Sequence, residues 1–322
     1  MSTAQEDDLG QARLAKAAED YCNWGRWGDD DQAGTLNFIT AEDVRNAAAT
    51  IARGQVFSLA IPFNNKGPQT GELLRFNPMR FMLRDGDDTF ARSLVGLPRG
   101  IGGADDVIML STHGATHWDA LAHVHYDSKM WNGYDCREVS SFGAERNDIT
   151  NYRDRIVGRA VLLDFPRFFG KPWCDLGQAI TPDDLDNCAA HQGVEIKRGD
   201  IVLLRFGHLA MVRDRGEWNH YAGGDAPGLA FDTLGWAFSH EIAAVASDTW
   251  GVEVRPNEFK YANQPFHRIA IPQMGLLMGE IFDLEALAAD CAEDGRYEMF
   301  FCANPLPVTG SVGGPINPTA IK

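Results

Sequence analysis

The stretch from residue 105 to residue 130, DDVIMLSTHGATHWDALAHVHYDSKM, concentrates side chains that bind cations. It holds four of the nine histidines of the chain, and His113, His117, Asp119 and His123 follow the pattern H-x3-H-x-D-x3-H. Imidazole nitrogens and a carboxylate suit Zn²⁺ or Mn²⁺, and the pattern contains no sulfur ligand. The fold must therefore bring these side chains together around one point.

The spacing limits how the backbone can run through this cluster. Four residues of extended strand span about 13 Å, so His113 and His117 can share an ion only if the chain turns or coils between them, and Gly114 permits a turn. His117 and Asp119 point the same way on a strand, because successive side chains alternate. We expect a buried strand at 107–110, then a turn, then ligands at a strand end and, over DALAH, at the start of a helix.

A structural role or a phosphate site would account for the cluster less well. A lone histidine is more often a hydrogen-bonded structural residue, but four histidines and an aspartate within thirteen positions rarely arise from packing. A phosphate-binding glycine loop is not indicated, since neither GxxxxGK[ST] nor GxGxxG occurs in this stretch.

The string HGATHWDALAH resembles the metal-binding motif of the cyclase-like metal-dependent hydrolases, a family that includes kynurenine formamidase, isatin hydrolase and trans-dienelactone hydrolase. Further matching pieces follow in the same order: PGL at 227–229, ASDTWGVE at 246–253 and FHRIAIPQMGLLMGEIFDLEAL at 266–287. The resemblance runs from about residue 20 to 305. It implies a swivelling β/β/α fold, with a mixed sheet or barrel-like β core and flanking helices, and it implies that His267 and Glu280 complete the metal site.

Two departures from the compact members bear on the substrate. Kynurenine formamidases usually have Pro two residues after the motif aspartate, where this chain has Leu121, and this chain is longer. It is more similar to the long branch that carries the name cyclase. The resemblance therefore specifies the fold more closely than the substrate.

Composition indicates a globular enzyme. The chain has 322 residues, 44% of them hydrophobic, which suffices for a substantial core, and we expect a polar segment at 1–20 followed by one domain at 21–322. Its net charge of −16 argues against nucleic acid or an anionic membrane as partner. Six scattered cysteines without a CxxC pair, an acidic N-terminus and the lack of a long apolar stretch predict a cytoplasmic protein with reduced thiols.

Local patterns predict the main elements. Thr40 caps a helix to about Arg53, and Thr181 with Pro182 opens another that ends near Gly193. A shorter helix is expected from Leu284 to Cys291. Short apolar runs predict strands at 56–63, 159–165, 200–206, 242–248 and 299–308. This partial alternation of strands and helices suits the implied fold better than a doubly wound sheet.

The predicted chemistry is hydrolytic. The candidate metal ligands are His113, His117, Asp119, His267 and Glu280. They exceed the ligands of one tetrahedral catalytic zinc, so either two ions share them through Asp119 or one Mn²⁺-like ion takes a subset. A bound divalent ion would activate water and polarise a carbonyl. His123 is the candidate general acid or base, in agreement with the resemblance, and Glu280 is the alternative base.

Further residues are candidates for the surroundings of the site. Substrate contacts are expected from aromatic and basic side chains, although such aromatic residues are more often part of a core: Trp24, Trp27, Phe76, Arg80 and Trp250. Asp248 follows a buried strand and either orients a histidine from behind or serves as a turn cap or surface ion pair.

Three functions stay open at this point. The first is a metal-dependent hydrolase that cleaves an amide, cyclic amide or lactone in a small, aromatic or other carboxylate-type substrate. The second is a metal-dependent lyase or cyclase, and the third is a catalytically silent metal-containing binding protein. The presence of His123 beside the ligands argues against the third. By resemblance, we also expect a homodimer or homotetramer.

Overall fold

The computed structural model describes residues 3–91 and 101–322, and within them nine strands form one curled, mixed sheet that makes a half-barrel. The strand order is β1-β15-β13-β7-β9-β11-β12-β4-β14. The bounds are β1 Val56–Ser58, β4 His117–Asp119, β7 Val157–Asp164, β9 Ile201–Arg205, β11 Ala244–Ser247, β12 Leu277–Glu280, β13 Glu298–Cys302, β14 Gly313–Pro315 and β15 Thr319–Ile321. This architecture confirms the predicted α/β fold class.

The centre of the sheet is parallel. β7, β9, β11 and β12 pair side by side in the same direction, and almost all of their side chains are buried. Continuous apolar runs are typical of parallel strands that are covered on both faces. The strands predicted at 159–165, 200–206 and 242–248 are therefore confirmed, whereas the runs at 56–63 and 299–308 form strands only over β1 and β13.

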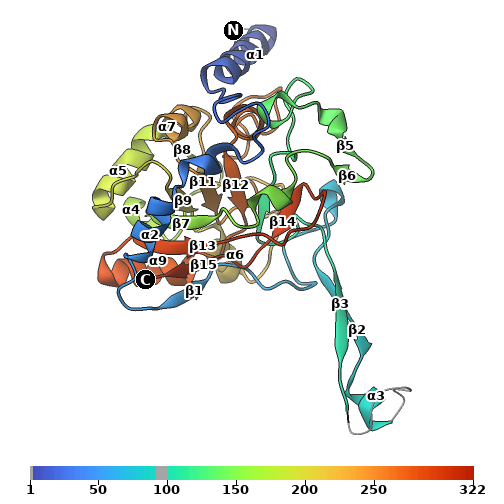
Figure 1. The fold of residues 1–322 in the computed structure, drawn as a ribbon. Helices are drawn as coiled ribbons and strands as arrows, with labels where there is room; N and C mark the ends of the chain where they lie inside the picture. The colour runs from blue at the N-terminus through green and yellow to red at the C-terminus, as the bar shows by residue number, and fades with distance from the viewer. Residues whose placement is uncertain (1–2, 92–100) are drawn as a thin grey trace.

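Helices flank the sheet (Figure 1). α2 contacts β7 and β13, α5 contacts β7, and α4 contacts β9. The α-helices are α1 Thr3–Asp20, α2 Ala41–Ala48, α3 Gly86–Phe90, α4 Phe165–Phe169, α5 Pro182–Gln192, α6 His208–Arg215, α7 Thr233–Ser239, α8 His267–Ile269 and α9 Glu285–Asp294. Shorter helical turns are η1 Gly34–Phe38, η2 Glu72–Leu74, η3 Trp131–Gly133, η4 Cys136–Glu138, η5 Ile149–Tyr152 and the π-helix η6 Ala270–Met274.

The capping predictions are confirmed at both helices that the sequence marks most strongly. Thr40 and Thr181 accept hydrogen bonds from the amides three residues ahead, of Asp43 and Asp184, whose side chains bond back. α5 ends at Gly193, which has the left-handed conformation expected there. α2 is shorter than predicted, because it ends at Ala48.

One arm of the molecule leaves the globular body. β2, Met79–Arg84, pairs with β3, Asp105–Met109, and Figure 1 shows the two as a ribbon projecting from the sheet. The strand predicted at 107–110 is present as part of β3, but its predicted burial is wrong, since the side chains from Asp105 to Met109 are exposed. A two-stranded ribbon has no second layer under which to bury them. The remaining short pairs are β8 Ala179–Ile180 with β10 Gly228–Leu229, and β5 Val139–Ser140 with β6 Gly143–Ala144.

The helix predicted over DALAH is also wrong. After β4 the chain makes a turn in which the His123 amide donates to the Ala120 carbonyl at 2.8 Å. The Ala120 and Ala122 amides donate instead to the carbonyls of Val312 and Asn147, and the Leu121 amide donates to the Tyr152 hydroxyl. The local backbone hydrogen bond of this segment thus spans three residues, and tertiary partners hold the segment as a turn. Within the described residues, no helix is long and apolar enough to cross a bilayer.

Candidate metal centre

Strand pairing brings the first ligands together. β4 lies antiparallel to β12, and His117 is directly opposite Glu280 in the register. Residues opposite each other share one face of a sheet, as do His117 and Asp119, which are two positions apart on β4. The Nε2 atom of His117 lies 3.3 Å from Asp119 Oδ1 and 3.3 Å from Glu280 Oε2.

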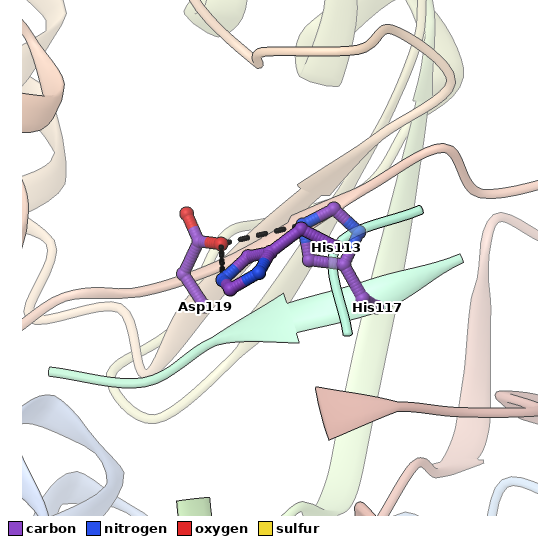
Figure 2. A group of neighbouring side chains, drawn as sticks. All are labelled: His113, His117 and Asp119. Atoms are coloured by element: carbon purple, nitrogen blue, oxygen red, sulfur yellow. Dashed lines mark ion pairs between the residues drawn. The ribbon is translucent and has the colours of Figure 1, made fainter. Parts of the chain in front are cut away.

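His113 joins them across the turn that the sequence predicts. Its Nε2 atom lies 3.5 Å from Asp119 Oδ1, and Figure 2 shows that oxygen facing both imidazole rings. The turn leaves the His113 ring against β14, where a Cβ atom added to Gly313 would lie 2.3 Å from Nε2. Glycine is therefore required at position 313 for the ring to occupy this place.

His267 joins the centre beside Glu280, from the start of the α8–η6 segment. Its Nε2 atom lies 3.2 Å from Glu280 Oε1, while its Nδ1 atom is in close hydrogen-bonding contact with Glu253. The amides of Phe266 and His267 also donate to the Glu253 carboxylate, at 3.2 and 3.0 Å. Glu253 thus fixes both the ring and the backbone that carries it, although the sequence did not single it out. The only signal was an acidic residue at the end of ASDTWGVE.

The histidines present the same edge to the centre. The His117 Nδ1 atom bonds the Ala115 carbonyl at 2.7 Å, and the His113 Nδ1 atom lies 3.1 Å from the Thr112 hydroxyl. With Nδ1 occupied at each ring, including His267, the Nε2 atoms are left to face inward. A metal-binding histidine is held in this way, with its second nitrogen fixed by another group.

The inward-facing atoms lack ordinary hydrogen-bond partners. The Nε2 atoms of His113 and His117 and the Oδ1 atom of Asp119 are buried and make no hydrogen bond. Buried polar atoms without partners are costly, so they indicate a missing ligand. Two donors each about 2.1 Å from one tetrahedral ion are about 3.4 Å apart, close to the separations found here. The residues present therefore fit a divalent metal ion.

Two overlapping groups of donors have this arrangement. One is His113, His117 and Asp119, and the other is Asp119, His267 and Glu280; in each group the candidate atoms lie within 4.8 Å of one another. Asp119 belongs to both. The five ligands expected from the sequence thus converge on one buried region.

The charges of the region are mutually stabilised. Burial opposes ionisation of Glu280, yet contacts with His117 and His267 hold its pKa well below the usual range of a glutamate. Burial lowers the pKa of His117, but the adjacent carboxylates of Asp119 and Glu280 outweigh it and raise that pKa to about 9. The buried carboxylates therefore require positive charge beside them, which either protons or a cation can supply.

His123 lies at the edge of this centre. Its ring stacks on the His113 ring at 4.1 Å, and its Nε2 atom lies 4.0 Å from Asp119 Oδ1, farther than the other imidazoles. Its side chain is 24% exposed, whereas those of His117 and His267 are buried. Burial and the nearby Arg75 lower the pKa of His123, partly offset by Asp119. At neutral pH the ring is therefore neutral and can accept a proton.

Comparison with known proteins identifies the family. The sequence from residue 57 to 254 matches the model of the family described as "Putative cyclase". A crystal structure of a novel cyclase is 37% identical, with a TM-score of 0.87 over 94% of this chain and 100% of that one. The chain belongs to the cyclase family. A search of curated sequences finds no match.

More distant structures share the fold. The isatin hydrolase A of Ralstonia solanacearum is 17% identical, with a TM-score of 0.61 over 88% of this chain and 98% of that one. The isatin hydrolase A of Labrenzia aggregata is 16% identical, with a TM-score of 0.60 over 86% and 96%. This cyclase-family chain is thus built on a fold that metal-dependent hydrolases use.

Several predicted substrate contacts lie elsewhere. Arg80 is exposed on the β2–β3 ribbon, 3.6 Å from Asp106, so its prediction as a site residue is corrected. Trp27 is half-buried and packs edge-on against the core residue Phe38, with 5.1 Å between the ring centres. The Trp24 indole donates to the Pro272 carbonyl at 2.7 Å. Aromatic side chains are common in both settings, and sequence pattern does not separate them.

Phe76 and Trp250 lie nearer the centre. The Phe76 amide donates to the Ser111 hydroxyl at 3.0 Å, and its carbonyl oxygen is close to the turn at Gly114. Trp250 is buried, and the guanidinium carbon of Arg75 lies 5.0 Å from its ring centre. Arg75 is the second residue that the sequence pattern did not reveal. It stands one position before Phe76, in the same RFNPMRFM string that supplied Arg80.

Asp248 does not orient a histidine. Its two carboxylate oxygens accept hydrogen bonds from the amides of Phe206 and Gly207, at 2.7 and 2.8 Å, just before α6. The turn-cap alternative therefore describes it, and Glu253 takes the orienting position that was predicted for Asp248. Complete burial raises the pKa of Asp248 to about 7.

A cavity of about 400 Å³ lies apart from the metal centre, between α6 and the segment that follows it. His208, Trp218 and Tyr221 are among its lining residues, and none of the candidate metal ligands is. The convergent donors, and not cavity size, mark the functional site.

Proposed function

We propose that this protein is a metal-dependent hydrolase that cleaves an amide, cyclic amide or lactone bond in a small carboxylate-type substrate. The observation that carries the proposal is the set of buried, unpartnered donor atoms of His113, His117 and Asp119 at the meeting point of β4, β12 and the His267 segment. Membership of the cyclase family supports it. So does the likeness in fold to an isatin hydrolase solved with the product analogue thioisatinate.

The metal would be held by His113, His117, Asp119, His267 and Glu280. The sharing of Asp119 by both donor groups supports two zinc ions, and one manganese ion that would be held by a subset of these residues is the alternative. When bound, a divalent ion supplies a nucleophile by acidifying water and polarises the carbonyl to be attacked. Glu253 holds the His267 imidazole in the orientation that this requires.

His123 would move the proton. Its greater exposure supports access by a substrate, and its Nε2 atom is 4.0 Å from Asp119 Oδ1 without being among the closest donors. A neutral imidazole there accepts a proton during attack and returns it to the leaving nitrogen or oxygen. Glu280 is the alternative base, since its Oε2 atom lies 3.3 Å from His117 Nε2 within the same group of ligands.

The test is turnover of N-formylkynurenine, isatin and trans-dienelactone by protein loaded with Zn²⁺ or Mn²⁺, with and without chelator. We expect hydrolysis of at least one compound, lost on chelation and restored by metal. The His123→Asn variant should keep its bound metal and lose about 100-fold or more in kcat. Full activity of His123→Asn would contradict the acid/base role, while a dehydrated or cyclised product would favour the lyase or cyclase alternative. Tight binding of a compound without turnover would favour a binding protein.

We also propose a cytoplasmic homodimer or homotetramer. The six cysteines are free in the structure, which supports a reducing compartment. The exposed apolar side chains of the β2–β3 ribbon, such as Phe81, Leu83 and Ile108, support self-association. Light scattering on the Phe81→Asp variant should show a smaller assembly than the parent, with Arg80→Gln as the control on the same ribbon.

A further inference from the structure

Arg75 combines two features that a surface arginine lacks. Its Nη2 atom lies 3.4 Å from the Nε2 atom of His123, at the edge of the metal centre. Its Nη1 atom is buried and makes no hydrogen bond. A buried guanidinium donor without an acceptor is costly, and the cost disappears when a ligand supplies one.

The guanidinium is held in place from behind. Trp250 is buried, and Arg75 and Arg255 both lie over its ring, with guanidinium carbons 5.0 and 5.7 Å from the ring centre. Arg255 is itself fixed by a hydrogen bond of 2.8 Å to the Gly223 carbonyl. Packing against an aromatic face orients the planar guanidinium without using any of its N–H donors.

A structural ion pair does not account for Arg75. Among the described side chains, those of residues 9–71, 73–91 and 101–322, no carboxylate forms an ion pair with it, whereas Arg159, Arg205 and Arg213 each pair with one or two. The Oδ1 atom of the nearby Asp119 lies among the histidines of the centre, 3.5, 3.3 and 4.0 Å from the Nε2 atoms of His113, His117 and His123. Arg75 is thus a fixed positive charge that faces the site and lacks its counter-ion.

We infer that Arg75 binds a carboxylate of the substrate and so selects anionic substrates. The inference rests on the proposed function, because it specifies which substrates reach the metal centre. One carboxylate oxygen accepts from Nη1, which satisfies the unpartnered donor, and the anchored molecule presents its scissile bond beside His123. Arginine suits this task because its planar fork matches a carboxylate. Trp250, predicted as a substrate contact, acts here as the support of Arg75.

The binding test uses sodium benzoate and benzamide, which have the same ring and differ in charge. Their affinities are measured by calorimetry on the wild type and on Arg75→Gln, Arg75→Lys and Arg80→Gln, each with metal loaded and after chelation. Arg75→Gln should weaken benzoate at least about tenfold and benzamide less than about twofold, and Arg75→Lys should fall between. Arg80→Gln, on the exposed ribbon, should match the wild type. Metal content and the far-UV spectrum should be the same in all variants.

Measurement after chelation separates Arg75 from the metal as the anion site. A preference for benzoate that persists without metal and disappears in Arg75→Gln supports the inference. A preference that disappears on chelation and is unchanged in Arg75→Gln overturns it, and so does a wild type that binds both compounds equally.

The failure of the inference is distinguishable from failure of the proposed function. If no compound of the hydrolysis panel is turned over but benzoate binding depends on Arg75, the function is wrong and the anion site stands. The opposite result is also recognisable. If a carboxylate substrate is turned over, and Arg75→Gln raises the KM of this substrate and the KM of its neutral methyl ester by the same factor, the function stands and the anion site is wrong.

Discussion

Two groups of buried charged residues lie in the same sheet and differ in how their charges are satisfied. In the first, Arg205 of β9 donates to Asp164 of β7 at 2.7 Å and to Glu285 of α9 at 2.8 Å. In the second, the metal centre, the atoms of His117 and Asp119 face one another at 3.3 Å, and neither His117 Nε2 nor Asp119 Oδ1 makes a hydrogen bond. The charges of the first group are paired within the chain, whereas the polar atoms of the second group need a partner that the chain does not supply.

The difference shows what distinguishes a structural cluster from a functional one. Burial and charge are common to both, so neither identifies a site. The two groups differ in where their polar atoms point. In the Arg205 group each hydrogen-bond donor has an acceptor, whereas in the metal centre several potential metal-ligand atoms point at one place. The two clusters should therefore respond in opposite ways to substitution.

The largest effect is expected from Asp119→Asn. Because Asp119 belongs to both donor groups, the variant should lose most of its bound metal and at least about a thousandfold in activity. Its fold should persist, since the sheet pairing of β4 does not involve the side chain. Metal content, turnover and circular dichroism check these three expectations. A variant that retains full metal content would remove Asp119 from the ligand set.

The converse change is Arg205→Met, which removes the 2.7 Å contact of the buried Asp164 carboxylate and leaves it only the longer contact, of 3.4 Å, with the exposed Arg167 side chain. The free energy of unfolding should fall by up to about 3 kcal/mol, because a buried charge that loses its closest partner is costly and the exposed Arg167 offsets this only in part. Urea unfolding of chelator-treated protein measures it, so that metal binding does not contribute. The folded variant should bind metal as the wild type does. A weaker effect on stability than that of Asp119→Asn in the same conditions would contradict the distinction between the clusters.

Local sequence pattern predicts the ligands that lie close together in the chain, and it does not predict the ligands that tertiary folding brings to them. Side chains two positions apart lie on one face of a strand, which explains why His117 and Asp119 point the same way. Gly114 permits the turn that brings His113 beside them. His267 and Glu280 came only from the family resemblance. The register that sets Glu280 opposite His117 depends on strand pairing between segments far apart in the chain, which local pattern does not specify.

The incorrect predictions have a common physical cause. The apolar run at 107–110 has the composition of a core strand, but its ribbon meets no second layer. Arg75 and Arg80 lie in one short stretch of sequence. β2 begins between them, at Met79, so Arg80 lies on the projecting ribbon while Arg75 stays beside Trp250. The environment that decides each residue is formed by segments distant in sequence.

A smaller effect on the metal centre is expected from Glu253→Gln. The carboxylate accepts from the His267 imidazole and from the His267 amide, so its loss loosens a ligand without removing one. Metal affinity should fall about 10- to 100-fold, as is usual for groups behind a ligand. Competition with a calibrated chelator measures it. Glu258→Gln, an exposed glutamate of the same segment, is the matched control. Equal affinities of the two variants would mean that Glu253 does not support His267.

The smallest effect is expected at His208, a buried histidine outside the metal centre, and it tests whether an unpartnered nitrogen alone indicates a missing ligand. His208 resembles the metal centre in one respect, since it is buried and its Nδ1 atom has no hydrogen-bond partner. It differs in that no carboxylate of the described residues pairs with it, and burial, with Arg215 nearby, lowers its pKa to about 4 from the ordinary 6.5. The folded protein therefore keeps His208 neutral at a pH where the unfolded chain is protonated.

The consequence for stability has a definite sign. As pH falls from about 6.5 toward 4, the unfolded chain gains a proton that the folded His208 refuses, so the wild type loses stability in this window, by about 2 kcal/mol at pH 5. His208→Leu should lack this contribution, whereas His220→Gln, at an exposed histidine, should keep it. Urea unfolding at pH 8 and pH 5 measures the difference. If His208→Leu lost as much stability on acidification as the wild type, His208 would be protonated in the fold. A single unpartnered nitrogen, as in His208, would then not distinguish a buried structural histidine from a metal ligand. Only the convergence of several unpartnered atoms, as in the metal centre, would identify a binding site.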